Sequence, residues 1–174
     1  MKHMICGMLS ACVGIFCFPA YGDWESSVLP KGYSTESSFE RATQAAKGSE
    51  KSVIVYYTRT NCPPCQVLQS NLRREEIRAA YEPRYVFTVV WGNGMDSRER
   101  EEYRTKYKVF GAPTWIIYNR QGEYLCTSSG GFANPEAGLR LHQVLQDVLI
   151  SKIELGTEAP RNCSSLPKAV RMPG

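Results

Sequence analysis

The sequence has 174 residues, a net charge of +4, 22% charged residues and 43% hydrophobic residues. This balance is typical of one globular domain with an ordinary core, and it excludes a disordered chain. The basic residues are spread along the chain without a long Lys/Arg run, so the sequence predicts no nucleic-acid partner.

The first 22 residues have the layout of a secretory signal. A short polar start at residues 2–3 is followed by an almost wholly apolar stretch at 4–18, and Ala20-Tyr21-Gly22 ends it with small residues two apart. We expect cleavage after Gly22 and a periplasmic location for the exported chain. The apolar stretch is short for a membrane span, which needs about 20 residues, so an uncleaved anchor is the weaker interpretation.

A second interpretation of this segment rests on Leu9-Ser10-Ala11-Cys12, which resembles the lipobox of bacterial lipoproteins. Cys12 would then be the lipidated N-terminus. The apolar stretch before Cys12 is short, however, and the residues after it stay apolar where a mature lipoprotein turns polar. Both interpretations predict export.

Export changes how the cysteines are counted. Three of the seven fall in the signal, and those that remain after cleavage are Cys62, Cys65, Cys126 and Cys163. An even number in an oxidising compartment permits two disulfides.

In the mature chain, residues 23–36 contain Ser, Gly and Pro with little periodicity, and we interpret them as a linker or irregular N-terminal segment. Ser37 or Ser38 then caps a predicted helix, which Gly48 ends. The run at 53–58 is rich in β-branched and aromatic residues and predicts a buried strand.

Two cysteines follow this strand in the motif Cys62-Pro63-Pro64-Cys65. Apolar residues at helical spacing predict a helix that begins at Pro63, pauses, and resumes at 75–81. The first cysteine therefore lies at a strand-to-helix turn, and the second lies about one turn into the helix.

The remaining elements continue the alternation. Residues 84–91 are a nearly continuous apolar run, which predicts a parallel strand covered on both faces. Asp96 or Ser97 caps a charged helix at 98–107. Further predicted elements are a strand at 115–118, a hairpin turn at 119–122, a return strand at 123–128, a last helix that starts at 134–136 and a polar tail from 156.

The cysteine pair at the head of the helix has the chemistry of a redox site. Unpaired N–H groups and the helix dipole favour a thiolate there, and in such motifs the pKa of the first cysteine falls from about 8.5 to between roughly 3.5 and 7.5. We therefore expect Cys62 to be the nucleophile and the more buried Cys65 to resolve the mixed disulfide. The two prolines stiffen the ring but do not by themselves assign an oxidant or a reductant.

A metal site is the competing interpretation of the pair. A structural zinc ion needs four ligands, and the mature chain adds only His142 and two distant cysteines. No Met- or His-rich stretch supports copper. We therefore predict no metal and no dissociable cofactor, and we expect His142 to lie on the surface of the last helix without a partner.

The order of the elements resembles the thioredoxin fold. Two motifs carry the resemblance: Cys62-Pro63-Pro64-Cys65, and Gly111-Ala112-Pro113-Thr114 about 50 residues later, just before the hairpin. The resemblance implies an α/β domain at 37–155, with a central mixed sheet of about four to five strands flanked by helices and a tail at 156–174.

The resemblance also implies a second half of the site. It implies that Pro113 follows a cis peptide bond and faces the cysteine pair. A backbone edge then stays open beside Cys62, and an extended substrate segment could pair with the main chain of Ala112 or Thr114.

The chain departs from the thioredoxin pattern at two positions. Many thioredoxins carry a buried carboxylate six residues before the first cysteine, which helps the second one lose its proton, and Tyr56 stands there. Asn61 replaces the Trp that often precedes the first cysteine. These changes leave dithiol exchange in place but put efficient thioredoxin-like reduction in doubt.

The other two cysteines, Cys126 on the return strand and Cys163 in the tail, could close a structural disulfide. Their loop of about 37 residues would stabilise the fold by roughly 3 to 4 kcal/mol in the chain-entropy treatment. Two independent cysteines are the alternative.

Taken together, the sequence predicts an exported thiol-disulfide oxidoreductase. It would exchange the Cys62–Cys65 disulfide with cysteines of other envelope proteins, in a direction that the motif leaves open, and a membrane electron donor or acceptor is an expected partner. The alternative is a non-catalytic thioredoxin-fold binding subunit of an envelope assembly, in which this disulfide is structural.

Overall fold

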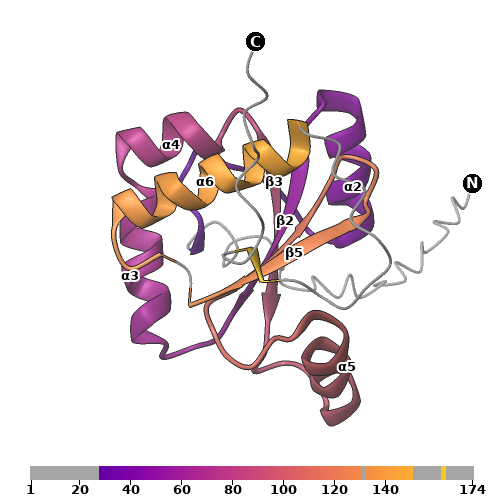
Figure 1. Cartoon of the computed structure of the whole chain (residues 1–174). Coiled ribbons are helices and arrows are strands. Elements are labelled where there is room, and N and C mark those ends of the chain that lie inside the picture. The colour runs from indigo at the N-terminus through magenta and orange to yellow at the C-terminus, as the bar shows by residue number, and fades with distance from the viewer. Residues whose placement is uncertain (1–27, 131, 151–161, 164–174) are drawn as a thin grey trace, which may run out of the picture.

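The structure is a computed structural model that describes residues 28–130, 132–150 and 162–163 (Figure 1). The predicted signal at 1–22, with the alternative lipidation site at Cys12, lies outside the described residues, as does most of the predicted tail. Within the described residues, no helix is long and apolar enough to cross a bilayer.

Five strands form one mixed sheet in the order β1-β3-β2-β4-β5. β1 and β2 both run parallel to β3, whereas β4 is antiparallel to β2 and to β5. This confirms the predicted mixed sheet. The strands are β1 (Ser34–Glu36), β2 (Ser52–Thr58), β3 (Tyr85–Trp91), β4 (Thr114–Tyr118) and β5 (Tyr124–Ser129).

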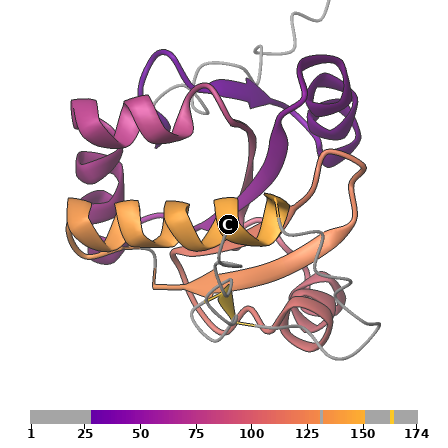
Figure 2. The ribbon, with the colours of Figure 1, turned by 45° about the horizontal axis from the view of Figure 1, so that its top comes forward.

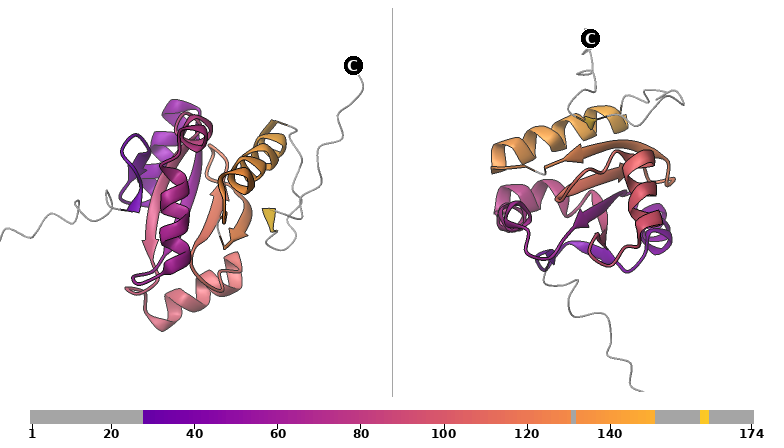
Figure 3. Two further views of the ribbon diagram at one scale, coloured as in Figure 1. Left: turned by 90° about the vertical axis from the view of Figure 1, so that its left-hand side faces the viewer. Right: turned by 90° about the horizontal axis from the view of Figure 1, so that it is seen from below.

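Helices cover both faces of the sheet. Side chains from α3, α4 and α6 share one buried cluster with the sheet, and side chains from α2 and α5 share the other. Figure 2 shows α3 and α4 on one side of the strands and α2 and α5 on the other, and Figure 3 shows α6 running beside the β4–β5 hairpin. The helices are α2 (Phe39–Ser49), α3 (Pro63–Leu72), α4 (Glu75–Tyr81), α5 (Ser97–Tyr107) and α6 (Pro135–Ile150).

The central strand β2 is buried along its whole length. Successive side chains of a strand point to opposite faces, so Ile54 and Tyr56 join the cluster under α3, α4 and α6, while Val53 and Val55 join the one under α2 and α5. Burial on both faces explains why β2 reads as an unbroken apolar run.

Two expectations about the N-terminal part of the domain were wrong in detail. The segment expected to be irregular contains β1, and Val28, Leu29 and Tyr33 just before it are buried. The helix expected to end at Gly48 instead runs through Ser49, and Glu50 takes the left-handed conformation at its C-terminal cap. The left-handed conformation favours glycine but does not require it, so the predicted end of the helix is one residue too early.

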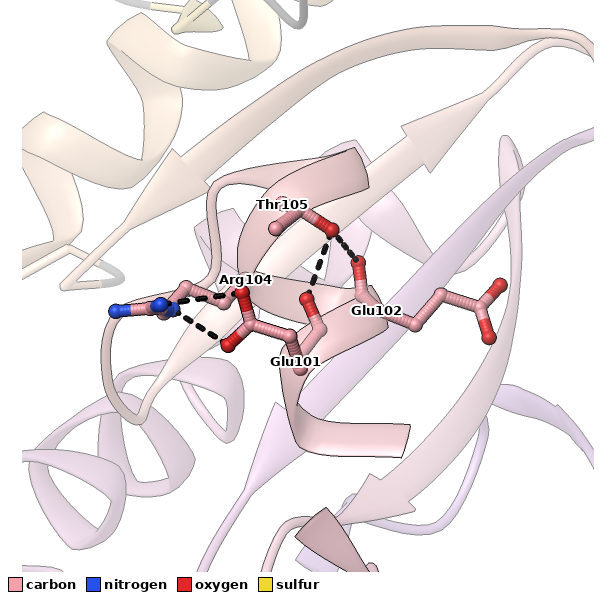
Figure 4. Close-up of polar contacts among 4 residues, drawn as sticks. All are labelled: Glu101, Glu102, Arg104 and Thr105. Carbon is pink, nitrogen blue, oxygen red and sulfur yellow. Dashed lines mark hydrogen bonds and ion pairs between the residues drawn. The ribbon is translucent and has the colours of Figure 1, made fainter. Parts of the chain in front are cut away.

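Helix α5 has a solvated outer face, as its many charges suggest. Asp96 caps it in a capping box with Glu99, and none of its residues is fully buried. Figure 4 shows the Glu101 carboxylate paired with Arg104 one turn later, and the Thr105 hydroxyl donating to the main-chain carbonyls of the preceding turn. The helix is held to the domain by its half-buried tyrosines, which pack against the cluster under α2.

Candidate active site at the start of helix α3

The first cysteine of the motif lies where β2 gives way to α3. β2 ends at Thr58, and Asn61 takes a left-handed conformation with φ of 52°, which turns the chain toward the helix. Cys62 is the N-cap residue, and Pro63 occupies the first helical turn, where a missing N–H costs nothing. The predicted strand-turn-helix placement of the motif is confirmed.

The two sulfurs of the motif form a disulfide. The Cys62 Sγ also accepts a hydrogen bond from the Cys65 main-chain N–H at 3.2 Å. Cys65 is only 2% exposed, whereas Cys62 is half-buried. The N–H groups at a helix N-terminus favour negative charge, and the Cys62 Sγ is both the sulfur that accepts one of them and the more exposed sulfur of the pair.

The Gly111–Thr114 segment lies against this disulfide. The Ala112–Pro113 peptide bond is cis, and the Ala112 carbonyl oxygen lies 3.6 Å from the Cys62 Sγ. The Thr114 hydroxyl donates to the Gly111 carbonyl at 2.6 Å, and the Pro113 carbonyl accepts from Gly130 at 2.8 Å. These bonds fix the loop on both sides of the proline, so the Ala112 main chain is held beside the sulfur.

The main-chain groups of this segment differ in their availability. Thr114 begins β4 and is paired with Tyr57 of β2 and with Ser129 of β5. Ala112 makes no backbone–backbone hydrogen bond among the described residues, and it is partly exposed. Of the three residues that sequence reasoning placed beside the pair, Ala112 is the one whose main chain is open to a ligand.

A residue that the sequence analysis missed holds the turn before Cys62. The Asn93 side-chain oxygen accepts a hydrogen bond from the Thr60 N–H at 2.8 Å, and the Gly92 N–H donates to the Thr58 carbonyl at 2.9 Å. The sequence indicates only where Asn93 lies in the fold, and not the contact itself. Asn93 follows β3, and the carboxyl ends of the neighbouring parallel strands β2 and β3 meet at the same edge of the sheet.

Tyr56, which stands where many thioredoxins have a carboxylate, is fully buried in the core. Its hydroxyl makes no hydrogen bond among the described residues, and burial raises its pKa. Thr58 and Gln69, whose side chains approach it without hydrogen-bond geometry, act in the opposite direction. Because the phenol stays protonated, Tyr56 does not supply the base that a carboxylate would offer.

The two remaining cysteines are also joined in the structure. Cys126 and Cys163 form a disulfide, and neither side chain is exposed. Beside it, Asn162 pairs in parallel with Thr127 of β5. The bridge therefore holds the 162–163 segment against the outer edge of β5.

The expectation that His142 lies on the surface without a partner was wrong. It is partly buried on α6, its ring lies 5.3 Å from the ring of Tyr81, and its Nδ1 lies 3.4 Å from the Tyr85 hydroxyl. Burial lowers its pKa, and the nearby positive charge of Arg84 acts in the same direction. Among the described residues, no group of three or more His, Cys, Asp or Glu could hold a metal ion.

Comparison with known structures shows the same architecture. A thioredoxin from Thermus thermophilus is similar at a TM-score of 0.59, with 19% identity over 71% of this chain and 94% of its own. A disulphide isomerase from Xylella fastidiosa Temecula1 is similar at a TM-score of 0.53, with 16% identity over 62% of this chain and 87% of its own. At these identities the similarity shows the fold alone. No curated protein matches the sequence.

The family comparison is more specific. The model of the thioredoxin-like domain matches residues 39–148, which include both the cysteine motif and the Gly111–Thr114 segment. A thioredoxin-like domain with a C-x-x-C disulfide at the head of a helix has the general arrangement of a thiol-disulfide oxidoreductase. The chain therefore belongs to the thioredoxin-like family.

Proposed function

We propose that the protein is an exported thiol-disulfide oxidoreductase that acts through Cys62 and Cys65. The single observation that carries this proposal is the asymmetry of the disulfide. Cys62 caps α3, receives the Cys65 N–H at 3.2 Å and is partly exposed, whereas Cys65 is buried. A structural disulfide gains nothing from one accessible sulfur at a helix N-terminus, but an exchange reaction needs one.

The reaction runs through a mixed disulfide at Cys62. A substrate thiolate attacks the Cys62 sulfur, the Cys62–Cys65 bond breaks, and Cys65 leaves as a thiolate. A second substrate thiolate then attacks the substrate sulfur and releases Cys62, so the substrate gains a disulfide and the protein becomes a dithiol. The reverse sequence reduces a substrate disulfide, and the relative reduction potentials of the two couples set the direction.

Ala112 supports the positioning of the substrate. Its carbonyl lies 3.6 Å from the Cys62 sulfur, and its main chain is unpaired within the described residues. An extended segment that hydrogen-bonds there brings its own cysteine next to Cys62. Pro113, which has no N–H, leaves this edge open, and Thr114 anchors the loop to the sheet.

The partners follow from the predicted export signal. In the periplasm the substrates are exported proteins that carry cysteines, and repeated turnover needs a membrane electron donor or acceptor. Processing at Cys12 instead of Gly22 would keep the same domain in the envelope as a lipoprotein. No dissociable cofactor enters the reaction, because the electrons are carried by the cysteine pair.

A non-catalytic binding subunit is the second candidate, and the protonated Tyr56 phenol in place of a carboxylate is the observation that favours it. The reduction potential separates the two functions. The protein is equilibrated in dithiothreitol redox buffers, and free thiols are alkylated and located by mass spectrometry. We expect Cys62 and Cys65 to titrate with a potential above about −300 mV. A lower potential, in the range of structural disulfides, would make the protein a binding subunit.

A further inference from the structure

The most exposed large apolar side chain in the described part of the chain belongs to Phe110, at 75%. It lies two residues before Ala112, so the two Cα atoms are at most about 7.6 Å apart. A phenyl ring left in water costs free energy that a bound partner can recover. Phe110 lies outside both buried clusters, in the segment whose Ala112 carbonyl contacts the Cys62 sulfur, and a bound partner is what could cover it.

Two further exposed apolar side chains belong to the segment that carries Cys62. Pro63 and Pro64 follow Cys62 directly and are both exposed. Because the Cys62 sulfur lies 3.6 Å from the Ala112 carbonyl oxygen, the segment that contains the two prolines and the segment that contains Phe110 meet at the disulfide. We call Pro63, Pro64, Phe110 and Ala112 the Phe110 surface.

The two chain segments that form the Phe110 surface carry charges of one sign only. Neither residues 59–74 nor residues 103–122 contain an Asp or a Glu. Arg59 and Lys108 are exposed and form no ion pair among the described residues. Arg59 is three residues from Cys62, and Lys108 is two residues from Phe110, so both lie within about 11 Å of these residues along the chain.

The acidic side chains of α5 and of its cap lie outside these two segments and have contacts of their own. On α5, Glu101 is paired with Arg104 (Figure 4) and Glu102 with Lys106. The Asp96 carboxylate accepts the N–H groups of Arg98 and Glu99 as a helix cap. Within the two segments that meet at the disulfide, the charged side chains without an ion pair among the described residues are therefore positive.

We propose that the Phe110 surface selects extended polypeptide segments in which the reacting cysteine is flanked by a large apolar residue and an acidic residue. This inference rests on the proposed function and names its substrate class. The apolar side chain packs on Phe110 and the two prolines, and the carboxylate faces Arg59 and Lys108. Phe110 is a specificity-determining residue, and the sulfur chemistry stays with Cys62 and Cys65.

The test uses the reduced full chain and matched peptides that each contain one intramolecular disulfide. The reference peptide has Leu and Glu next to its first cysteine, and two further peptides replace Leu by Ser or Glu by Lys. The protein dithiol reduces the peptide disulfide and is itself oxidised. Samples are quenched with acid, and the second-order rate constant is measured by mass spectrometry. Hydroxyethyl disulfide, small and neutral, measures the chemistry without docking.

We expect wild-type protein to reduce the reference peptide about tenfold faster than either replacement peptide. Phe110→Ala should lower the Leu preference to within about twofold, and dividing each peptide rate by the rate of the same variant with hydroxyethyl disulfide separates docking from the sulfur chemistry. Arg59→Gln with Lys108→Gln should remove the Glu preference, as should about 1 M salt, where the Debye length is about 3 Å. Phe110→Gln serves as a second variant in case Phe110→Ala is poorly folded.

Two matched controls come from exposed residues outside these segments. Leu139→Ala removes an exposed apolar side chain of α6, and Lys47→Gln removes an exposed charge of α2. Both variants should keep the Leu and Glu preferences of the wild type. The inference is overturned if Phe110→Ala keeps the Leu preference, if all peptides react equally, or if gel filtration shows that Phe110 joins two copies of the chain. Failure with every peptide and with hydroxyethyl disulfide would instead overturn the proposed function.

Discussion

The Cys62 sulfur and the Ala112 carbonyl oxygen are fifty residues apart in the chain and 3.6 Å apart in the fold. One belongs to the start of a helix, and the other to the loop before an antiparallel strand. β2 and β4 lie side by side in the sheet, and this pairing brings the two loops together. The position of the disulfide therefore depends on the pairing of two central strands of the sheet, which are buried along their length.

We expect the Asn93 side chain to help position Cys62. Asn93→Ala removes the acceptor of the Thr60 N–H, so the turn before Cys62 loosens. We expect a loss of about 0.5 to 1.5 kcal/mol in stability and a several-fold slower exchange with hydroxyethyl disulfide.

The pH dependence of Cys62 alkylation distinguishes positioning from a purely structural role of Asn93. The midpoint should move upward in Asn93→Ala, because the helix N-terminus no longer holds the sulfur as closely. Asn93→Asp keeps an acceptor oxygen and should keep the turn. Unchanged alkylation and exchange in Asn93→Ala would show that the Thr60 contact is dispensable.

We expect the Cys126–Cys163 disulfide to contribute measurably to the free energy of unfolding. Its two cysteines are 37 residues apart, so the chain-entropy treatment gives about 3 to 4 kcal/mol. The double variant Cys126→Ala and Cys163→Ala should unfold at a temperature lower by about 10 °C, as followed by circular dichroism.

The same bridge should also be protected from reagents. Because both side chains are fully buried, mild reduction followed by alkylation in the folded state should label the partly exposed Cys62 and leave Cys126 and Cys163 unmodified. An unchanged melting temperature in the double variant, or labelling of Cys126 and Cys163 equal to that of Cys62, would contradict a structural role for this bridge.

We expect His142 to make the folded protein less stable at acidic pH. Burial, and then Arg84, lower its pKa from the ordinary value of 6.5, so the unfolded chain binds a proton more readily than the folded one. The contribution of the buried neutral imidazole to the free energy of unfolding is therefore fully present above about pH 6.5. It declines as the pH falls through 6.5 toward the lower pKa of the folded state.

Urea unfolding at a series of pH values measures this decline. His142 is the one histidine among the described residues, so His142→Asn should flatten the curve between pH 7 and 5 relative to wild type. An identical pH dependence in wild type and His142→Asn would show that another group causes the decline.

Much of the fold was predictable because the sheet is buried on both faces. Strands such as β2 and β3 need apolar side chains at nearly every position, and this leaves a strong pattern in the sequence. The start of α3 was equally clear, because Pro63 fits only the first turn of a helix. In contrast, β1 has three half-buried residues and no apolar pattern. It forms a strand because its main chain pairs with β3, which the local sequence does not indicate.

The site was predictable only in part. The cysteine motif and Pro113 are local signals, and the resemblance to the thioredoxin fold placed them together. The contact between Asn93 and Thr60 joins two loops through one side chain, and a local pattern does not specify it. The setting of His142 likewise depends on where α6 crosses Tyr81 and Tyr85, which only the packed structure shows.

The measurement that tests the central claim most directly is the trapping of mixed disulfides in the envelope. Cys65→Ala removes the resolving thiol, so a substrate joined to Cys62 stays attached and appears as a larger species on non-reducing gels. We predict that Cys65→Ala captures exported proteins with cysteines, that reduction releases them, and that adding Cys62→Ala abolishes capture. No captured protein with Cys65→Ala, or equal capture without Cys62, would contradict the oxidoreductase.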